Sequence, residues 1–125
     1  MKLTIRNSPN KGRGVFTEAK IQKGTTIETA PVLVMPAAQG QHLDQTELYN
    51  YYYAWGQNQD EIAVVLGYGS LYNHSYQPSA VYRKDIASRT IEYSALRDIE
   101  PGEEITINYN GDPKDLSPLW FEVAG

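Results

Sequence analysis

The sequence predicts a mostly β protein that folds as a single domain. Several short apolar runs alternate in the manner of strands and are separated by Gly, Pro and Asn turn signals. Only residues 45–55 carry helical spacing. The chain has 125 residues, of which 41% are hydrophobic, and this length suits one hydrophobic core. Short strands around one helix are therefore the expected architecture.

In the first third of the chain, the pattern indicates strands joined by turn-rich loops. A strand is expected wherever Thr, Val and Ile dominate, and the longest of these runs ends at Pro36. The expected segments are strands at 2–6, 15–16 and 26–35, a loop at 7–14, a turn at 21–24 and a loop at 36–41.

The single helix is expected over residues 45–55. Asp44 and Glu47 have the spacing of a capping box, with Asp44 at the cap. Gly56 is expected to end the helix. The apolar positions that recur at helical intervals are Leu48, Tyr51, Tyr52 and Trp55. An aromatic stripe of this kind, which also includes Tyr53, is more typical of core than of a substrate channel.

The second half of the chain returns to strand patterns. The expected segments are a strand at 62–66, a tight bend at 67–69, a hairpin of 79–84 with 89–96, and a last strand at 105–109. Residues 97–105 echo residues 20–27 in placing a Gly at the same distance before a strand. We interpret the echo as one kind of turn that is used twice, and not as a domain repeat.

The composition excludes several classes of site and partner. No Cys is present, which rules out disulfides, thiolate metal sites and a Cys nucleophile, and two His leave little room for zinc. The net charge of −4 and a pI near 5.1 argue against nucleic-acid binding and suit a basic protein partner. The N-terminus lacks a signal-peptide core, and no run approaches the roughly 18 apolar residues of a membrane span. We therefore expect a soluble, cytoplasmic protein.

Three clusters stand out in the sequence, and each is weak when taken alone. They read KGRGVF at 11–16, LYNHSYQPSA at 71–80 and GEEITINY at 102–109. Together, in this order and with the starts of the last two about 30 residues apart, they resemble the motifs of SET-domain protein lysine methyltransferases. The resemblance covers nearly the whole chain. In its short length, the chain resembles the stand-alone SET proteins of bacteria and viruses.

The resemblance implies a fold of several small β-sheets with one short helix. A pseudoknot-like threading of the C-terminal segment would bring residues 73–78 beside 105–112. The chain would be a single SET domain over 1–125, with a core at 2–112 and a tail at 113–125 that is a candidate cover for the site. Zinc modules that flank the domain in many relatives are absent from this sequence.

The resemblance also implies S-adenosylmethionine as cofactor. Gly12 and Gly14 would let the backbone approach its methionine end, with Arg13 between them, and Asn73 would anchor the amino-acid end. The other cofactor-binding residues implied are His74, through its backbone, and Trp120, folded back over the site. A buried His74 with a purely structural role is the alternative for that residue.

For catalysis, the resemblance implies that a neutral lysine amine attacks the methyl group in line. Alignment of the amine with the methyl group then supplies most of the reduction in activation free energy, on the order of 7 to 11 kcal/mol. Tyr109 would orient the methyl group and the amine, Tyr68 would line the channel, and Tyr82 would limit the number of methyl groups. The alternative for Tyr82 is a half-buried strand residue. No dedicated general base is evident in the sequence.

Two residues depart from the family pattern and leave the channel geometry open. Ser79 stands where Asn commonly follows the Pro, and Asn110 stands where Gly commonly follows the catalytic Tyr. The expected partner is a basic, lysine-bearing protein or peptide, and a homodimer is a further possibility. A nuclear or host-cell location is the alternative to the cytoplasm. The competing functions are a SET-like binding module without activity and, more remotely, a single-strand nucleic-acid binder.

Overall fold

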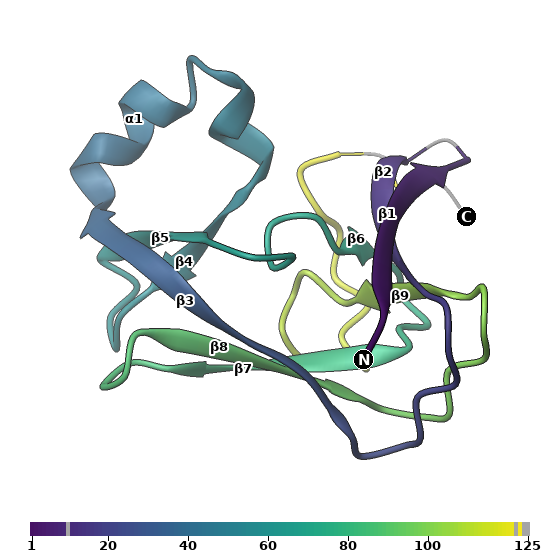
Figure 1. The fold of residues 1–125 in the computed structure, drawn as a ribbon. Coiled ribbons are helices and arrows are strands. Elements are labelled where there is room, and N and C mark those ends of the chain that lie inside the picture. The colour runs from purple at the N-terminus through teal and green to yellow at the C-terminus, as the bar shows by residue number, and fades with distance from the viewer. Residues whose placement is uncertain (10, 122, 124–125) are drawn as a thin grey trace. The chain divides into compact units, whose positions relative to one another are not determined.

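The computed structural model describes residues 1–9, 11–121 and 123. Two β-sheets and one short helix make up the regular structure of these residues, and the expected mostly β class is confirmed (Figure 1). The strands are β1 (Leu3–Ser8), β2 (Gly12–Thr17), β3 (Thr26–Pro36), β4 (Tyr52–Trp55), β5 (Glu61–Val65), β6 (Asn73–His74), β7 (Ala80–Asp85), β8 (Thr90–Ala95) and β9 (Glu104–Ile107). The helix α1 (Gly40–Leu43) lies between two 3₁₀ turns, η1 (Ala37–Gln39) and η2 (Glu47–Asn50).

The chain divides into two compact units. The first unit contains residues 1–28, 71–83 and 92–125, and the second contains residues 29–70 and 84–91. All three sequence motifs belong to the first unit. A single domain over 1–125 stays a prediction.

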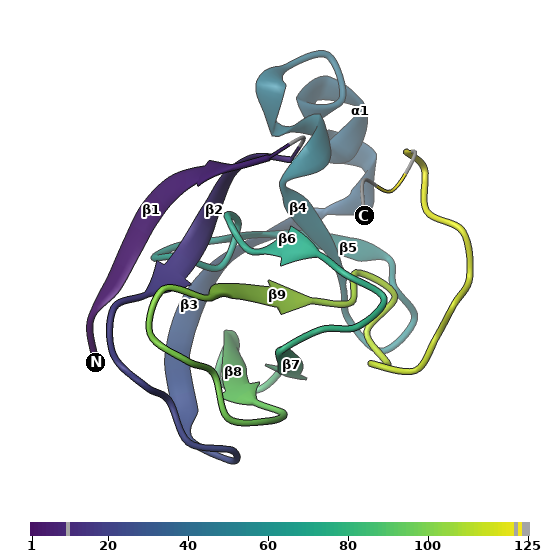
Figure 2. The ribbon, with the colours of Figure 1, turned by 90° about the vertical axis from the view of Figure 1, so that its right-hand side faces the viewer.

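In the first unit, a four-stranded sheet has the order β1-β2-β9-β6. The strands β1 and β2 form an antiparallel hairpin, and β2 pairs antiparallel with β9. The two-residue strand β6 lies parallel to β9, with Asn73 opposite Thr106 and His74 opposite Ile107 (Figure 2). The expected approach of residues 73–78 to residues 105–112 is thereby confirmed, whereas threading of the chain stays a prediction.

The core of the first unit follows from the alternation of its strands. Ile105 and Ile107 project to one face of β9 and are fully buried, as is Val15 on β2. The rings of Tyr72 and Tyr93 pack with centroids 4.5 Å apart, and both side chains are buried. Burial of large side chains of this kind supplies most of the stability of a small sheet.

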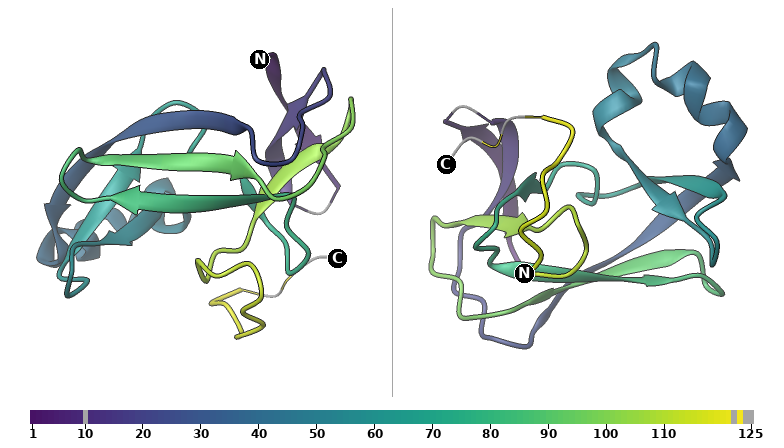
Figure 3. Two further views of the ribbon diagram at one scale, coloured as in Figure 1. Left: turned by 90° about the horizontal axis from the view of Figure 1, so that it is seen from below. Right: turned by 180° about the vertical axis from the view of Figure 1, so that it is seen from behind.

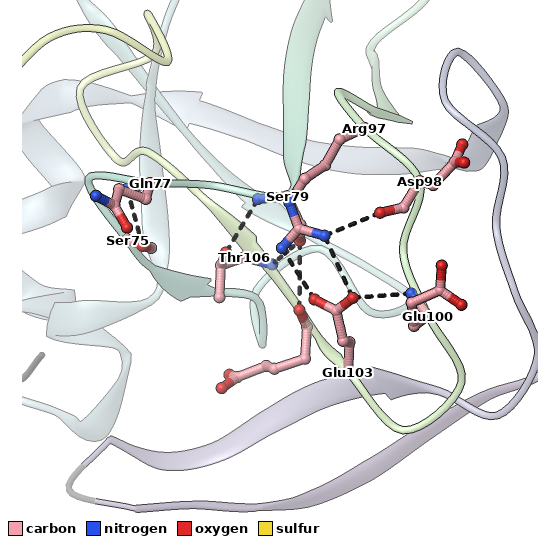
Figure 4. A network of polar contacts seen from close by, with 9 residues as sticks. Ser75, Gln77, Ser79, Arg97, Asp98, Glu100, Glu103 and Thr106 are labelled. Atoms are coloured by element: carbon pink, nitrogen blue, oxygen red, sulfur yellow. Dashed lines mark hydrogen bonds and ion pairs between the residues drawn. The ribbon is translucent and has the colours of Figure 1, made fainter.

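The two echoing segments make the same turn and pair with each other. Gly24 and Gly102 both have φ of 85°, in the left-handed region that Gly adopts without strain. Ile21 and Ile99 exchange both backbone hydrogen bonds, at 2.9 and 2.8 Å. Arg97 clamps the second turn through a bidentate ion pair with Glu103 (Figure 4). The interpretation of one turn used twice is confirmed.

The second unit contains the paired strands β4 and β5, and β5 also pairs antiparallel with the second half of β3. Its buried apolar residues include Trp55, Ile62, Ala63 and Val65. The expected strands at 26–35 and 62–66 are confirmed to within one residue at each end. The strands β7 and β8 form the expected hairpin (Figure 3).

The prediction of a helix over residues 45–55 is wrong. The α-helix lies earlier, at 40–43; within 45–55 only residues 47–50 are helical, as a 3₁₀ turn, and residues 52–55 form strand β4 instead. Tyr52 and Tyr53 pair with Val64 and Ala63 of β5, and aromatic residues suit strands. This nonlocal pairing overrides the helical spacing. The cap also differs, because Thr46 accepts the Leu48 N–H with its side chain.

Two boundaries differ in the motif regions. Residues 12–14, expected in a loop, form the start of β2, where Gly12 pairs with Ser8 of β1. Tyr109, expected in the last strand, lies beyond the end of β9. Within the described part of the chain, no helix has the length and apolar character needed to cross a membrane.

Candidate functional site

Tyr109 is held at both ends by the segment that precedes and includes β6. Its phenol O–H donates a hydrogen bond to the backbone carbonyl of Tyr72 at 2.6 Å. Its backbone N–H donates to Nδ1 of His74 at 3.0 Å. Because β6 and β9 are parallel neighbours, the residue just after β9 is carried directly past the residues of β6. The ring of Tyr109 is therefore fixed in position and in rotation.

His74 is a buried, neutral histidine in a ring of aromatic side chains. Since its Nδ1 accepts a hydrogen bond, its proton is on Nε2. Burial, with the nearby Lys11 charge, lowers its pKa below the ordinary value. Within the described residues, Nε2 is buried and has no hydrogen-bond partner. The rings around it are those of Tyr76, Tyr109 and Phe121, all at edge-on angles.

The side chain of Asn73 is fixed by two acceptors. Its Nδ2 donates to the Arg13 carbonyl at 3.1 Å and to Oε2 of Glu104 at 2.7 Å. Both amide hydrogens are thus committed to the protein. The Oδ1 atom remains as an acceptor for a bound group, since no other described residue donates to it.

The two positions of the first motif that carry Gly disfavour a side chain for different reasons. A Cβ at Gly14 would collide with the carboxylate of Glu104 and approach Nδ2 of Asn73 to 2.7 Å. A Cβ at Gly12 would meet no atom of the described residues within 4 Å, but its φ of 75° disfavours other residues. The space beside Gly14 is therefore filled by protein atoms, whereas no described residue fills the space beside Gly12. Arg13 between them is exposed, and its carbonyl holds Asn73.

Tyr82 is brought against Tyr109, and Tyr68 is in the other unit. The Tyr82 hydroxyl donates to the Tyr109 carbonyl at 3.3 Å, and burial raises the pKa of Tyr82 to about 12. The hydroxyl is therefore neutral at physiological pH. Tyr68 is half-buried in the second unit, so its expected place in a channel beside Tyr109 stays a prediction.

The tail lies against the ring of Tyr109. Trp120 stacks on it with centroids 5.9 Å apart and an interplanar angle of 14°, and Phe121 packs edge-on. The tail is anchored because Asn110 Nδ2 and the Tyr76 hydroxyl both donate to the Ser117 carbonyl, each at 3.0 Å. Asn110, a departure from the family pattern, thus has a structural reason. Residues 122, 124 and 125 of the expected cover lie outside the described residues.

Ser79, the other departure, joins its segment to β9. Its Oγ accepts from the Thr106 N–H at 3.0 Å and donates to the Glu104 carbonyl at 3.3 Å. Its own N–H donates to Oγ1 of Thr106 at 3.2 Å (Figure 4). The Ser79 side chain is fully buried. Ser at this position, where Asn is common in the family, therefore makes a polar link between the second and third motifs.

Sequence reasoning missed Glu104 and Ser8. The Ser8 hydroxyl donates to Oε1 of Glu104 at 2.7 Å across 96 residues of sequence. Glu104 lies in the third motif and could have been singled out as a carboxylate on an apolar strand. Nothing in the sequence marks Ser8, because an isolated Ser before a turn is ordinary. Among the described residues, no group of three or more His, Cys, Asp or Glu could hold a metal ion.

Comparison with protein families decides which class these motifs represent. Residues 12–110 match the family model of the SET domain. The chain belongs to the SET-domain lysine methyltransferase family. The match begins at Gly12, the second residue of the first motif, and ends at Asn110, so it covers the rest of that motif and the whole of the other two.

Individual SET-domain proteins are also similar to this chain in sequence or in structure. A histone-lysine N-methyltransferase of Schizosaccharomyces pombe, described as "H3 lysine-37 specific", is 40% identical over 121 residues, which are 96% of this chain and 77% of that protein. The crystal structure of a candidate histone methyltransferase of Plasmodium falciparum is 28% identical with a TM-score of 0.65, and covers 89% of this chain and 99% of that one. A ctPRC2 complex has a TM-score of 0.74 at 18% identity, over 86% of this chain and 14% of that chain, and shows the fold alone.

The SET-domain methyltransferases use S-adenosylmethionine, which supplies a methyl group on a positively charged sulfur. Two atoms of this chain fit such a molecule. Asn73 Oδ1 is an acceptor suited to an ammonium group, and the buried Nε2 of His74 is a donor with no partner in the described residues. The open side of Gly12 leaves backbone accessible beside them. The donor and acceptor set therefore fits the cofactor.

Proposed function

We propose that this SET-domain protein methylates a lysine side chain of histone H3. The relative that is 40% identical is described as specific for lysine 37 of that histone, which makes this position the first to test. An acidic chain with a net charge of −4 suits a basic histone segment. This substrate would place the protein in the nucleus, the alternative location raised by the sequence.

The mechanism rests on one observation, the hydrogen bond that the Tyr109 hydroxyl donates to a backbone carbonyl. Its O–H donates to the Tyr72 carbonyl at 2.6 Å, and because a phenol oxygen accepts as well as donates, it would accept an N–H from the substrate amine. Such a bond would hold the neutral amine with its lone pair free to attack. Tyr109 thus acts by orientation, and orientation is the main source of rate in a one-step displacement.

Tyr82 would act in the same manner at the next position. Its hydroxyl donates to the Tyr109 carbonyl, so its oxygen is also an acceptor for an amine N–H. Each methyl group that replaces an N–H removes one such bond and adds bulk. We therefore propose that Tyr82 favours the addition of a single methyl group.

Trp120, Asn73 and His74 complete the proposed assignment. Trp120 covers one face of the Tyr109 ring and would exclude water from it. Asn73 and His74 would bind the cofactor through the free acceptor and donor described above. Gly12 and Arg13 would offer backbone to it.

The test is methyl transfer to recombinant histone H3 with isotopically labelled S-adenosylmethionine. Wild type and Tyr109→Phe are compared, and the modified residue is located by mass spectrometry. We expect label on one H3 lysine with wild type and at least a tenfold lower rate with Tyr109→Phe. Equal rates would remove Tyr109 from the proposed role. Cofactor binding without transfer to H3 or to a proteome lysate would instead favour the inactive binding module.

A further inference from the structure

The carboxylate of Glu104 contacts all three other strands of its sheet. From β9 it accepts the Ser8 hydroxyl of β1 at 2.7 Å and the Asn73 amide of β6 at 2.7 Å. On β2 it occupies the space that a side chain at Gly14 would need. A carboxylate engaged by two donors in this way cannot rotate freely.

The ordering of Asn73 depends on this carboxylate. An Asn side chain can present either its oxygen or its nitrogen to a ligand, and the two orientations have nearly the same shape. Here the orientation is decided because the nitrogen must face Glu104 and the Arg13 carbonyl. Hydrogen bonds to a charged acceptor are about twice as strong as neutral ones. The negative charge of Glu104 therefore selects the orientation in which Oδ1 is presented.

We propose that Ser8 and Glu104 are positioning residues that hold Asn73 with its Oδ1 ready to accept the ammonium group at the amino-acid end of S-adenosylmethionine. The inference rests on the proposed cofactor site and goes beyond it, because it gives a positioning role to two residues that would not contact the cofactor. Ser8 is 6% exposed and acts only through Glu104. Glu104 acts only through Asn73.

The first test separates the amino-acid end from the rest of the cofactor. Binding of S-adenosylhomocysteine, which has the ammonium group, and of methylthioadenosine, which lacks the amino-acid end, is measured by calorimetry. For Ser8→Ala we expect about threefold weaker binding of the first, and for Glu104→Ala about tenfold weaker binding. Binding of methylthioadenosine should be unchanged for both variants. Equal weakening of both ligands would overturn the proposal.

Matched variants separate positioning from general stability. Ser8→Thr keeps the hydroxyl and should restore the affinity that Ser8→Ala loses. Glu103→Ala removes the neighbouring carboxylate, which pairs with Arg97 and not with Asn73, and should leave S-adenosylhomocysteine binding unchanged. Failure of the Thr rescue, or an equal loss with Glu103→Ala, would overturn the proposal.

A double-mutant cycle tests the order of action. If Ser8 works only through Glu104, the variant with both Ala substitutions should bind S-adenosylhomocysteine as Glu104→Ala does. Additive losses would overturn the relay. In turnover, the KM for S-adenosylmethionine should rise in Ser8→Ala while kcat and the KM for histone hold. The binding measurements need no histone, so an absence of transfer by wild type would count against the proposed function and not against this inference.

Discussion

The backbone N–H of Tyr109 donates to Nδ1 of His74 at 3.0 Å. This bond exists only while Nδ1 is unprotonated, because a protonated Nδ1 would place two donors face to face. His74 is 4% exposed, and burial followed by the Lys11 charge lowers its pKa below 6.5. The position of the proposed catalytic Tyr is therefore coupled to the charge of one histidine.

The first prediction is a loss of stability and activity on acidification. The pKa of His74 is lower in the folded protein than in the unfolded chain, so the unfolded chain binds the extra proton first as the pH falls below 6.5. The stabilisation is complete above that pH and declines below it, until the folded pKa is reached. We expect Tm and methyl transfer to fall between pH 7 and pH 5.5.

The control for this prediction uses both histidines of the chain. His74→Gln should lose much of the pH dependence of Tm over that interval, whereas His42→Gln, at an exposed residue, should keep it. A pH dependence that is the same in His74→Gln and wild type would show that another group is responsible.

Much of the fold could be predicted from local patterns, and the exceptions are nonlocal. The alternation in 89–96 and the glycines at 24 and 102 identify a hairpin strand and two turns, because those signals are written within a few residues. The segment 52–55 could not be assigned, since its partner strand β5 outweighs its own helical spacing. The motifs located Asn73 and Tyr109, but the link from Ser8 to Glu104 spans 96 residues and has no local signal.

The second prediction concerns the number of methyl groups. Tyr82→Phe removes the hydroxyl that donates to the Tyr109 carbonyl and opens space near the proposed amine position. We expect wild type to give mainly monomethyl-lysine and Tyr82→Phe to give di- and trimethyl-lysine, as measured by mass spectrometry of histone H3. Tyr53→Phe is the matched control, because its hydroxyl also donates to a backbone carbonyl, that of Gly69 in the second unit. Identical product distributions for Tyr82→Phe and wild type would contradict the assignment.

The third prediction tests the tail. Trp120→Ala removes the ring that stacks on Tyr109, and because Trp120 is 53% exposed the stability should change by less than about 1 kcal/mol. We expect kcat/KM to fall by about tenfold with little change in Tm, since the substitution exposes the Tyr109 ring to water. Trp120→Phe should retain most of the activity. Leu116→Ala, at a tail residue that is 73% exposed, should behave as wild type. Full activity in Trp120→Ala would show that the tail does not serve the site.

The last prediction separates the two glycines of the first motif. Gly14→Ala forces the Glu104 carboxylate to move and so breaks its bonds to Ser8 and Asn73. The loss of hydrogen bonds to a charged group corresponds to about 1.5 to 3 kcal/mol, and the KM for S-adenosylmethionine should rise at least tenfold. Gly12→Ala meets no atom within 4 Å in the part of the chain that the structure describes, but it is strained at φ of 75° and should lower stability by about 1 kcal/mol. We therefore expect Gly14→Ala to change cofactor binding more than Tm, and Gly12→Ala to lower Tm through backbone strain. Calorimetry with S-adenosylhomocysteine and thermal unfolding of both variants check the pair. Equal cofactor affinity in Gly14→Ala and wild type would mean that Glu104 can move without disturbing Asn73.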